Sequence, residues 1–217
     1  MKEIVIVGAG GFGREVLALL RTVNHDWLVI GFADDLIPVG TKIGGLEVLS
    51  NIESLKTWSQ PLGVVIAIGN PRTRKAIYDS LSQCRGTWFP NIISPNAVLM
   101  GDISLGEGNI VCAGAILTTD IQIGSFNIIN LSCTIGHDVR IADFCTMAPM
   151  VSLSGYTRLE TGVDLGTKAT VIPGRAIGQW SVIGAGGVVI SDIAAHSTAV
   201  GVPARVIKQE TGDGSGA

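Results

Sequence analysis

Residues 123–159, IGSFNIINLSCTIGHDVRIADFCTMAPMVSLSGYTRL, place an aliphatic side chain at every sixth position. The spacing extends outward in both directions, from Leu99 to Val189, over sixteen consecutive positions without a break. These positions are Leu99, Leu105, Val111, Leu117, Ile123, Ile129, Ile135, Ile141, Met147, Leu153, Leu159, Leu165, Val171, Ile177, Ile183 and Val189. If about a third of positions were aliphatic at random, such a run would have odds on the order of one in ten million, so composition does not explain it.

A period of six fits neither the 3.6-residue period of a helix nor the plain alternation of a strand. It fits a short strand followed by a turn, repeated three times in each coil of the chain. The aliphatic residue then points into a triangular prism, and the small residue that often follows it lets the chain turn the corner. Successive coils stack at the strand spacing of about 4.8 Å. We therefore predict a parallel β-helix of about five coils over residues 99–189. An ordinary β-sandwich would need strands and loops of varied length.

The composition of the 217 residues agrees with such a fold, since 29 are glycine and only 5% are aromatic. A formal charge of −3 gives no global attraction to nucleic acid or to an anionic membrane surface. No apolar run approaches the roughly 18 to 20 residues of a spanning helix, and the start, MKEIVIVGAGGFG, lacks the features of a signal peptide. These features predict a soluble, cytoplasmic protein that does not insert into a membrane. The tail, residues 211–217, is expected to be flexible.

Residues 1–88 predict a different, α/β domain. The apolar strand Lys2–Val7 leads into Gly8–Gly13 and a helical pattern from Arg14 to about Val23, and a second strand, Trp27–Phe32, leads into Asp34 and Asp35. A third strand, residues 63–68, precedes a helical pattern over residues 72–83. A glycine loop at a helix N-terminus lets backbone N–H groups approach a diphosphate.

The glycine pattern alone does not decide the ligand of this domain. It is typical of NAD-binding folds, with Asp34 or Asp35 on the ribose. However, about 88 residues suffice for only half of a dinucleotide-binding unit, which favours a nucleotide sugar. An α/β domain that binds no nucleotide is the third possibility.

The motifs GAGGFGREV, GFADD, AIGNPRTRKAI, NLSCTIGHDVRIADF and VGVPARVIK occur in this order between residue 2 and about residue 208. In this the chain resembles the hexapeptide-repeat sugar O-/N-acyltransferases. That family includes sialic-acid O-acetyltransferases and N-acetyltransferases of nucleotide-linked 4-amino-4,6-dideoxy sugars. The resemblance implies a half-Rossmann-like nucleotide-sugar domain (1–88), a left-handed β-helix with a C-terminal extension (89–210), a homotrimer, and acetyl-CoA bound between neighbouring prisms without a metal.

Acetyl transfer from a thioester needs a base, and the chain has three histidines. His25 lies in a polar connection and is expected in solvent, and His196 follows the last repeat, where we expect a surface residue. His137 comes two residues after the inward-pointing Ile135, at the outer edge of a coil, and matches the family's catalytic histidine. Asp138 matches the acid that makes this imidazole more basic, although it is alternatively only a polar turn residue.

Gly155 follows His137 by one coil, so its backbone N–H is expected near the base. The resemblance implies that this amide binds the thioester oxygen, whereas the alternative is a glycine that only turns a corner. The resemblance further assigns Gly10, Gly11 and Phe12 to the diphosphate, Asp34 and Asp35 to the nucleobase and ribose, Gly69 to the nucleotide and Asn130 to the sugar.

For acetyl-CoA, the resemblance implies contacts with Thr167 and Ala185. Arg205 and Lys208 are candidates for the CoA phosphates, or are simply solvated. Many relatives carry a second histidine where this chain has Thr146, so His137 must act alone, while Thr146 is a candidate hydrogen-bond partner for the thioester or a CoA amide.

Four cysteines, Cys84, Cys112, Cys133 and Cys145, form no CxxC pair and are expected to be small buried apolar residues. The sequence thus predicts an acetyl-CoA-dependent N-acetyltransferase that acetylates the 4-amino group of a nucleotide-linked amino-deoxy sugar by direct attack. The alternatives are an O-acetyltransferase acting on a sugar hydroxyl, as in sialic acid or a polysaccharide precursor, and a non-catalytic nucleotide-sugar-binding protein.

Overall fold

The computed structural model describes residues 2–23 and 26–210, so His25 and the predicted tail lie outside the described residues. The contacts of the chain fall into two compact units, one ending at Ser94 and the other beginning at Pro95. None of the helices in the described residues is long and apolar enough to cross a membrane.

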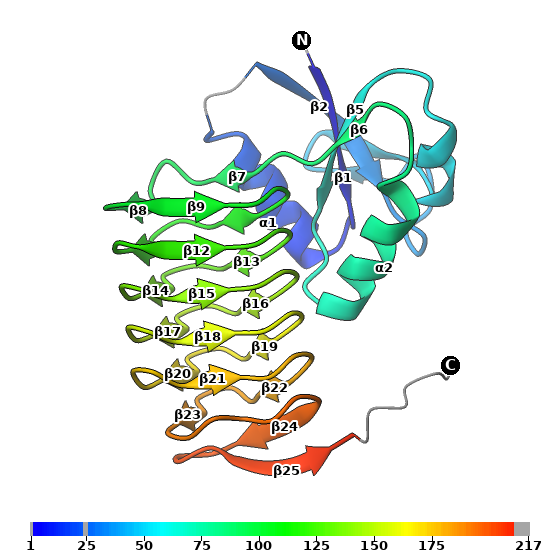
Figure 1. Cartoon of the computed structure of the whole chain (residues 1–217). Coiled ribbons are helices and arrows are strands. Elements are labelled where there is room, and N and C mark those ends of the chain that lie inside the picture. The colour runs from blue at the N-terminus through cyan, green and yellow to red at the C-terminus, as the bar shows by residue number, and fades with distance from the viewer. Residues whose placement is uncertain (1, 24–25, 211–217) are drawn as a thin grey trace. The chain divides into compact units, whose positions relative to one another are not determined.

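The first unit is built on a twisted sheet whose strand order is β3-β4-β2-β1-β5-β6 (Figure 1). The pairs β1–β2, β1–β5, β2–β4 and β5–β6 are parallel, and only the β3–β4 hairpin is antiparallel. The strands are β1 (Lys2–Val7), β2 (Trp27–Ala33), β3 (Lys42–Ile43), β4 (Leu46–Ser50), β5 (Leu62–Ile66), β6 (Thr87–Trp88) and, after the sheet, β7 (Ile92–Ile93). Strand β5 and the last four residues of β1 are buried, which explains their continuous apolar sequence.

Two helices and one 3₁₀ turn connect these strands: α1 (Gly11–Leu20), η1 (Glu53–Thr57) and α2 (Pro71–Leu81). Helix α1 begins three residues before the predicted start, because Gly10 is its N-cap and the glycine loop itself forms the first turn. Helix α2 begins at Pro71, with the side chain of Asn70 accepting a hydrogen bond from the Thr73 N–H. Its sequence therefore supplies both a cap and a proline at the first helical position.

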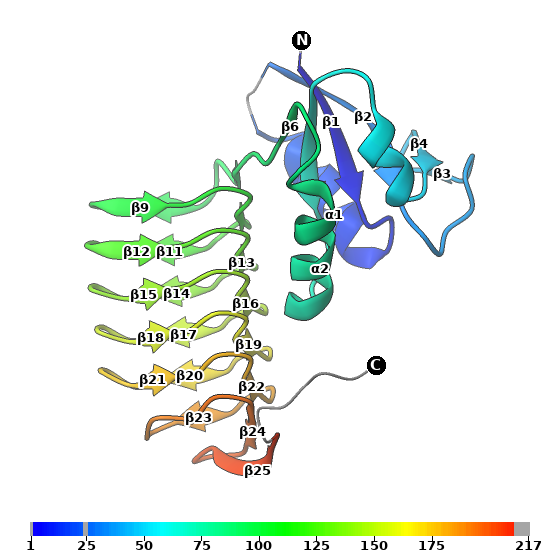
Figure 2. The same ribbon diagram turned by 45° about the vertical axis from the view of Figure 1, so that its right-hand side comes forward.

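The second unit is the predicted parallel β-helix, in which short strands stack into three sheets (Figures 1 and 2). One sheet has the order β23-β20-β17-β14-β11-β8 and another the order β21-β18-β15-β12-β9. The third includes, in order, β10, β13, β16, β19, β22, β24 and β25. The strands are β8 (Val98–Leu99), β9 (Ile103–Leu105), β10 (Ile110–Val111), β11 (Ile116–Leu117), β12 (Ile121–Ile123), β13 (Ile128–Ile129), β14 (Thr134–Ile135), β15 (Arg140–Ile141), β16 (Thr146–Met147), β17 (Ser152–Leu153), β18 (Arg158–Leu159), β19 (Asp164–Leu165), β20 (Thr170–Val171), β21 (Ala176–Ile177), β22 (Val182–Ile183), β23 (Val188–Val189), β24 (Ser197–Val200) and β25 (Arg205–Gln209).

The six-residue column forms the interior of this β-helix as predicted. From Val111 to Val189 every member is no more than 4% exposed. The exceptions are the first two members: Leu99 is 38% exposed and Leu105 is half-buried, since both lie in the first coil. The column therefore fixes both the coil length and the direction of each neighbouring side chain.

The corners of the prism are tight turns that need a residue with positive φ. Glycine fills some of them, but nine non-glycine residues spaced by multiples of six from Asp120 to Trp180 adopt φ between 57° and 64°. Two of these, Phe126 and Phe144, are buried and stack with ring centroids 5.2 Å apart. Burial thus offsets the backbone cost at that corner.

The β-helix ends with a shortened coil. Ile183 of β22 pairs with Ala199 of β24, a separation of sixteen residues instead of eighteen. The last strand, β25, then pairs with β24 in the antiparallel direction. These strands lie beyond the stretch predicted from the repeat.

Candidate functional site

His137 and Asp138 occupy one corner of the β-helix, directly after β14. His137 Nδ1 lies 2.9 Å from Asp138 Oδ2, and the two side chains are 55% and 41% exposed. Asp138 has φ 59°, a conformation that aspartate tolerates better than most residues. Because an ionised carboxylate only accepts hydrogen bonds, this contact favours the imidazole tautomer with its proton on Nδ1, which leaves Nε2 as the acceptor.

The next coil supplies two further neighbours of the imidazole. A Cβ built on Gly155 would lie 2.5 Å from His137 Cε1, so the ring lies directly against this glycine. The ring of Tyr156 meets the imidazole edge-on, with centroids 5.1 Å apart and an interplanar angle of 85°. The structure therefore brings His137, Asp138 and Gly155 together as expected, and adds Tyr156, which the sequence analysis missed.

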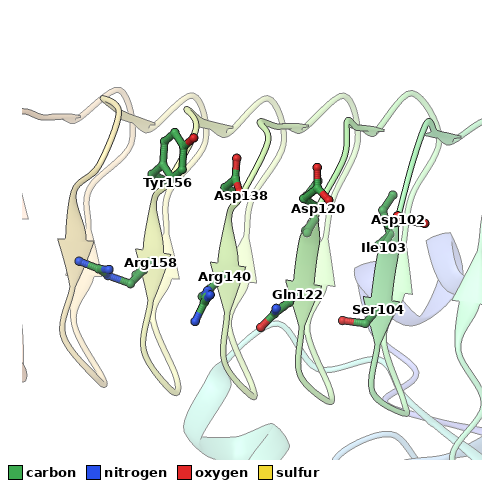
Figure 3. A pocket seen from close by; sticks show the side chains of 10 residues that line it. Asp102, Ile103, Ser104, Asp120, Gln122, Asp138, Arg140, Tyr156 and Arg158 are labelled. Carbon is green, nitrogen blue, oxygen red and sulfur yellow. The ribbon is translucent and has the colours of Figure 1, made fainter.

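A groove of about 640 Å³ runs along the outer face of β9, β12, β15 and β18, beside this corner (Figure 3). Asp138 and Tyr156 lie along one edge of it, and Arg140 and Arg158, paired in register on β15 and β18, lie along its floor. The outward position of both arginines follows from the repeat, because each precedes an inward-pointing member of the six-residue column.

The glycine loop of the first unit contains two kinds of glycine. A Cβ on Gly13 would lie 1.9 Å from the Gly8 carbonyl oxygen, so Gly13 is required for packing. A Cβ on Gly10 or Gly11 would have no heavy atom within 4 Å. Packing therefore does not explain Gly10 and Gly11, whereas close approach of a ligand to the backbone would.

Asp34 follows β2, and its carboxylate accepts a hydrogen bond from the glycine loop. Its Oδ2 accepts a hydrogen bond from the Ala9 N–H at 2.7 Å, and its Oδ1 accepts from the N–H groups of Leu36 and Ile37. Burial raises the pKa of this carboxyl, but the three backbone bonds outweigh it, so the pKa lies below its ordinary value. Asp35 is exposed and accepts a bond from the Ile52 N–H.

Replacing Asp34 with asparagine should lower the free energy of unfolding by about 1–2 kcal/mol at neutral pH, because one amide oxygen cannot accept all three bonds. A lowered pKa in the folded state means that this stabilisation is present above the unfolded value near 4 and is lost as pH falls through the folded value. The difference between wild type and Asp34→Asn in urea unfolding should therefore shrink below about pH 4. A difference that stays constant down to pH 2 would contradict it, and Asp35→Asn is the matched control.

Gly69 follows β5, close in sequence to a buried arginine that the sequence analysis did not single out. A Cβ on Gly69 would also have no neighbour within 4 Å. The Arg74 side chain is 1% exposed, and its Nη1 donates to the carbonyl oxygens of Ile68 and Gly69 at 2.7 and 2.9 Å. Its position on the buried face of α2, with Pro71, Ile77 and Leu81, is the sequence signal that could have revealed it.

The residues expected to contact acetyl-CoA do not all lie together. Thr167 and Ala185 are exposed at the same corner of successive coils, where the Gly186 N–H donates to the Thr167 carbonyl. Asn130, which is expected to hold the sugar and not acetyl-CoA, lies at the corresponding corner of an earlier coil, and its side chain accepts a bond from the Leu131 N–H. Thr146 is instead only 8% exposed, within β16.

Arg205 and Lys208 are exposed on β25, where Lys208 forms an ion pair with Glu210. His196 is half-buried at a turn with φ 58°. These contacts place none of the three residues, Arg205, Lys208 and His196, beside His137.

The cysteines form no disulfide bond in the described part of the chain, and three of them, Cys112, Cys133 and Cys145, are buried. Burial raises the pKa of the Cys133 thiol to about 11, which makes its thiolate scarce at neutral pH. Among residues 2–23 and 26–210 there is no group of three or more histidine, cysteine, aspartate or glutamate side chains that could hold a metal ion.

The six-residue column and the three stacked sheets are the architecture of hexapeptide-repeat proteins, and the comparisons with known proteins place the chain among acyltransferases of that fold. A family profile described as the PglD N-terminal domain matches residues 3–81. WeeI from Acinetobacter baumannii is 31% identical, with a TM-score of 0.86 over 95% of this chain and 100% of WeeI. PerB from Caulobacter crescentus, solved with CoA and GDP-perosamine, is 30% identical, with a TM-score of 0.85 over 96% of this chain and 98% of PerB.

A third structure, the acetyltransferase domain of PglB from Neisseria gonorrhoeae in complex with acetyl coenzyme A, is 27% identical, with a TM-score of 0.82 over 95% of this chain and 99% of that domain. Curated acetyltransferases from Enterococcus faecalis and Staphylococcus aureus match over shorter segments, and the chain spans 22% and 30% of their length. The chain belongs to the hexapeptide-repeat sugar O-/N-acyltransferase family, and its β-helix is of the left-handed type.

Proposed function

We propose that this protein is an acetyl-CoA-dependent N-acetyltransferase that acetylates the 4-amino group of a nucleotide-linked amino-deoxy sugar. The observation that carries the proposal is the His137–Asp138 pair, exposed on a corner of the β-helix in a chain that aligns along nearly all of PerB. PerB was solved with CoA and a GDP-linked sugar, so both substrate classes have a precedent on this fold.

In the proposed reaction the neutral sugar amine attacks the thioester carbonyl carbon directly. His137 Nε2 takes the amine proton, while the Asp138 carboxylate holds Nδ1–H and stabilises the imidazolium that forms. The Gly155 amide is the proposed donor to the oxyanion. The C–S bond then breaks, the acetyl group stays on nitrogen, and the CoA thiolate leaves and is protonated. No acyl-enzyme is needed, in line with the buried cysteines.

The first unit is the proposed nucleotide-sugar domain, with the diphosphate at Gly10, Gly11 and Phe12. The uncapped N-terminus of α1 and the open space over Gly10 and Gly11 support this assignment. Asp34 and Asp35 are proposed for the ribose and nucleobase, with Gly69 beside them and Asn130 on the sugar. Thr146, Thr167 and Ala185 remain the proposed acetyl-CoA contacts, in a cytoplasmic homotrimer that binds CoA between neighbouring prisms.

The activity is tested by incubating the protein with acetyl-CoA and UDP-, GDP- or dTDP-linked 4-amino sugars while thiol release is followed. We expect release that depends on one amino sugar, with an N-acetyl product identified by mass spectrometry. Release only with a hydroxyl acceptor would identify an O-acetyltransferase. Nucleotide-sugar binding without any release would identify a non-catalytic binding protein, and either result would overturn the proposal.

The diphosphate site is tested separately with Gly11→Ala. The added methyl group meets no protein atom, so the melting temperature should stay within about 2 °C, whereas the affinity for the nucleotide sugar should fall about tenfold or more because the backbone can no longer be approached closely. Isothermal titration calorimetry measures the affinity, and Glu15→Ala, on the exposed side of α1, is the control. Unchanged affinity in Gly11→Ala would exclude a diphosphate at this loop.

A further inference from the structure

Gly155 is important for its missing side chain as well as for its amide group. A Cβ at this residue would lie 2.5 Å from His137 Cε1, 2.6 Å from Nε2 and 3.0 Å from Nδ1. Such distances are too short for real contacts, so any side chain would push the imidazole away. Gly155 is itself buried, because the His137 ring and the neighbouring coils cover it. Because Gly155 has no side chain, the imidazole of His137 can lie directly against it.

Tyr156 is a second neighbour of the His137 imidazole. It follows Asp138 by one coil at the same corner, has φ 62°, and is 58% exposed. A tyrosine in the left-handed region costs on the order of 1 kcal/mol or more. Phe126 and Phe144 adopt the same conformation but are buried, whereas Met150, which is 52% exposed, adopts it at another corner, so the contacts of Tyr156 and not its φ set it apart. Its ring packs edge-on against His137, and its backbone N–H donates to the His137 carbonyl oxygen at 3.0 Å.

We propose that Gly155 and Tyr156 are positioning residues that hold the His137 imidazole for catalysis. Gly155 supports the face of the ring, Tyr156 limits its rotation, and Asp138 fixes Nδ1, so that Nε2 is the nitrogen presented to the substrate amine. This inference rests on the proposed role of His137 as base. It differs from the oxyanion role of Gly155, because it depends on the absent side chain and not on the N–H.

The two roles of Gly155 are separated by Gly155→Ala, which keeps the amide and adds one methyl group. With the imidazole displaced, kcat should fall about 10- to 100-fold while KM for acetyl-CoA and for the sugar changes less than about threefold. Pro173→Ala, at the same corner one coil later, is the matched control and should keep its full activity. An unchanged kcat in Gly155→Ala would overturn the proposal.

Tyr156 is tested with a pair of substitutions. Tyr156→Phe keeps the ring and should keep nearly all of kcat. Tyr156→Asn removes the ring but favours the left-handed conformation, so the melting temperature should hold or rise while kcat falls about tenfold. A purely structural role predicts no loss of kcat in a variant that is equally stable. Full activity of Tyr156→Asn would therefore contradict the positioning role.

A spectroscopic measurement keeps this test independent of turnover. In ¹⁵N-labelled protein, the His137 ring should show a single neutral tautomer with the proton on Nδ1, and Gly155→Ala and Tyr156→Asn should show a mixture. If wild type acetylates none of the amino sugars, the proposed function fails, but the tautomer measurement still decides the arrangement of the ring. A single tautomer in all three proteins would refute the positioning role even if the enzyme is active.

Discussion

His137→Ala should lower kcat for acetyl transfer by about 10²- to 10⁴-fold, the usual contribution of a positioned general base. The side chain is exposed, and its removal exposes no apolar core, so the melting temperature should stay within about 2 °C of wild type. Asp138→Asn should cost less, about tenfold, because asparagine tolerates the positive φ of this corner but holds Nδ1–H less strongly. Steady-state assays of thiol release measure both losses.

Thr119→Ala provides the control for these two variants, because Thr119 lies at the same corner one coil before His137. Its hydroxyl contacts Asp120 at 3.1 Å, much as His137 contacts Asp138, so the substitution repeats the geometric change without touching the imidazole. Its activity should equal that of wild type. Residual activity above about a third of wild type in His137→Ala would show that the reaction needs no base at this corner.

Leu153→Ala should lower the free energy of unfolding by about 2–5 kcal/mol, the range for truncating a buried leucine. Leu153 is 1% exposed and lies in the column between Ile135 and Val171 of the neighbouring strands. The strands around Leu153 cannot move inward to fill the space left by the removed leucine atoms, because each strand is held by hydrogen bonds to a strand on either side. Urea unfolding followed by circular dichroism measures the loss.

Ser152→Ala changes the adjacent residue on the outward face of the same strand and should alter stability by less than about 0.5 kcal/mol. If the two substitutions were equally costly, residue 153 would not point inward, and the assignment of inward and outward positions from the six-residue period would fail.

The β-helix could be predicted in detail because one signal is repeated in every coil. Each inward residue, such as Leu165 or Ile177, has the same environment, so the period alone gives its burial. The same arithmetic places Gly155 one coil after His137. The sequence could not give the direction of a corner side chain, because the edge-on packing of Tyr156 depends on its rotamer and not on its register.

The α/β unit was predicted less completely, because its elements are not repeated. The strands β1, β2 and β5 were expected from their apolar runs, whereas β3 and β6 have two residues each and β4, although as long as β5, is mostly half-buried and carries no continuous apolar run. The bonds from Ala9, Leu36 and Ile37 to Asp34 depend on how two loops approach each other. Asp34 is therefore a candidate ligand residue that also holds its own loop in place.

The antiparallel closing strand has a consequence for the solubility of the protein. A solenoid that stopped at a parallel strand would present a row of unpaired N–H and C=O groups, onto which another solenoid could add and grow into a filament. Here β25 reverses direction over β24 and faces outward with Arg205 and Lys208 among its exposed side chains. The parallel stacking of the coils cannot be continued across this reversed rung, and its charged side chains disfavour pairing between two such ends, which limits one route to filament growth.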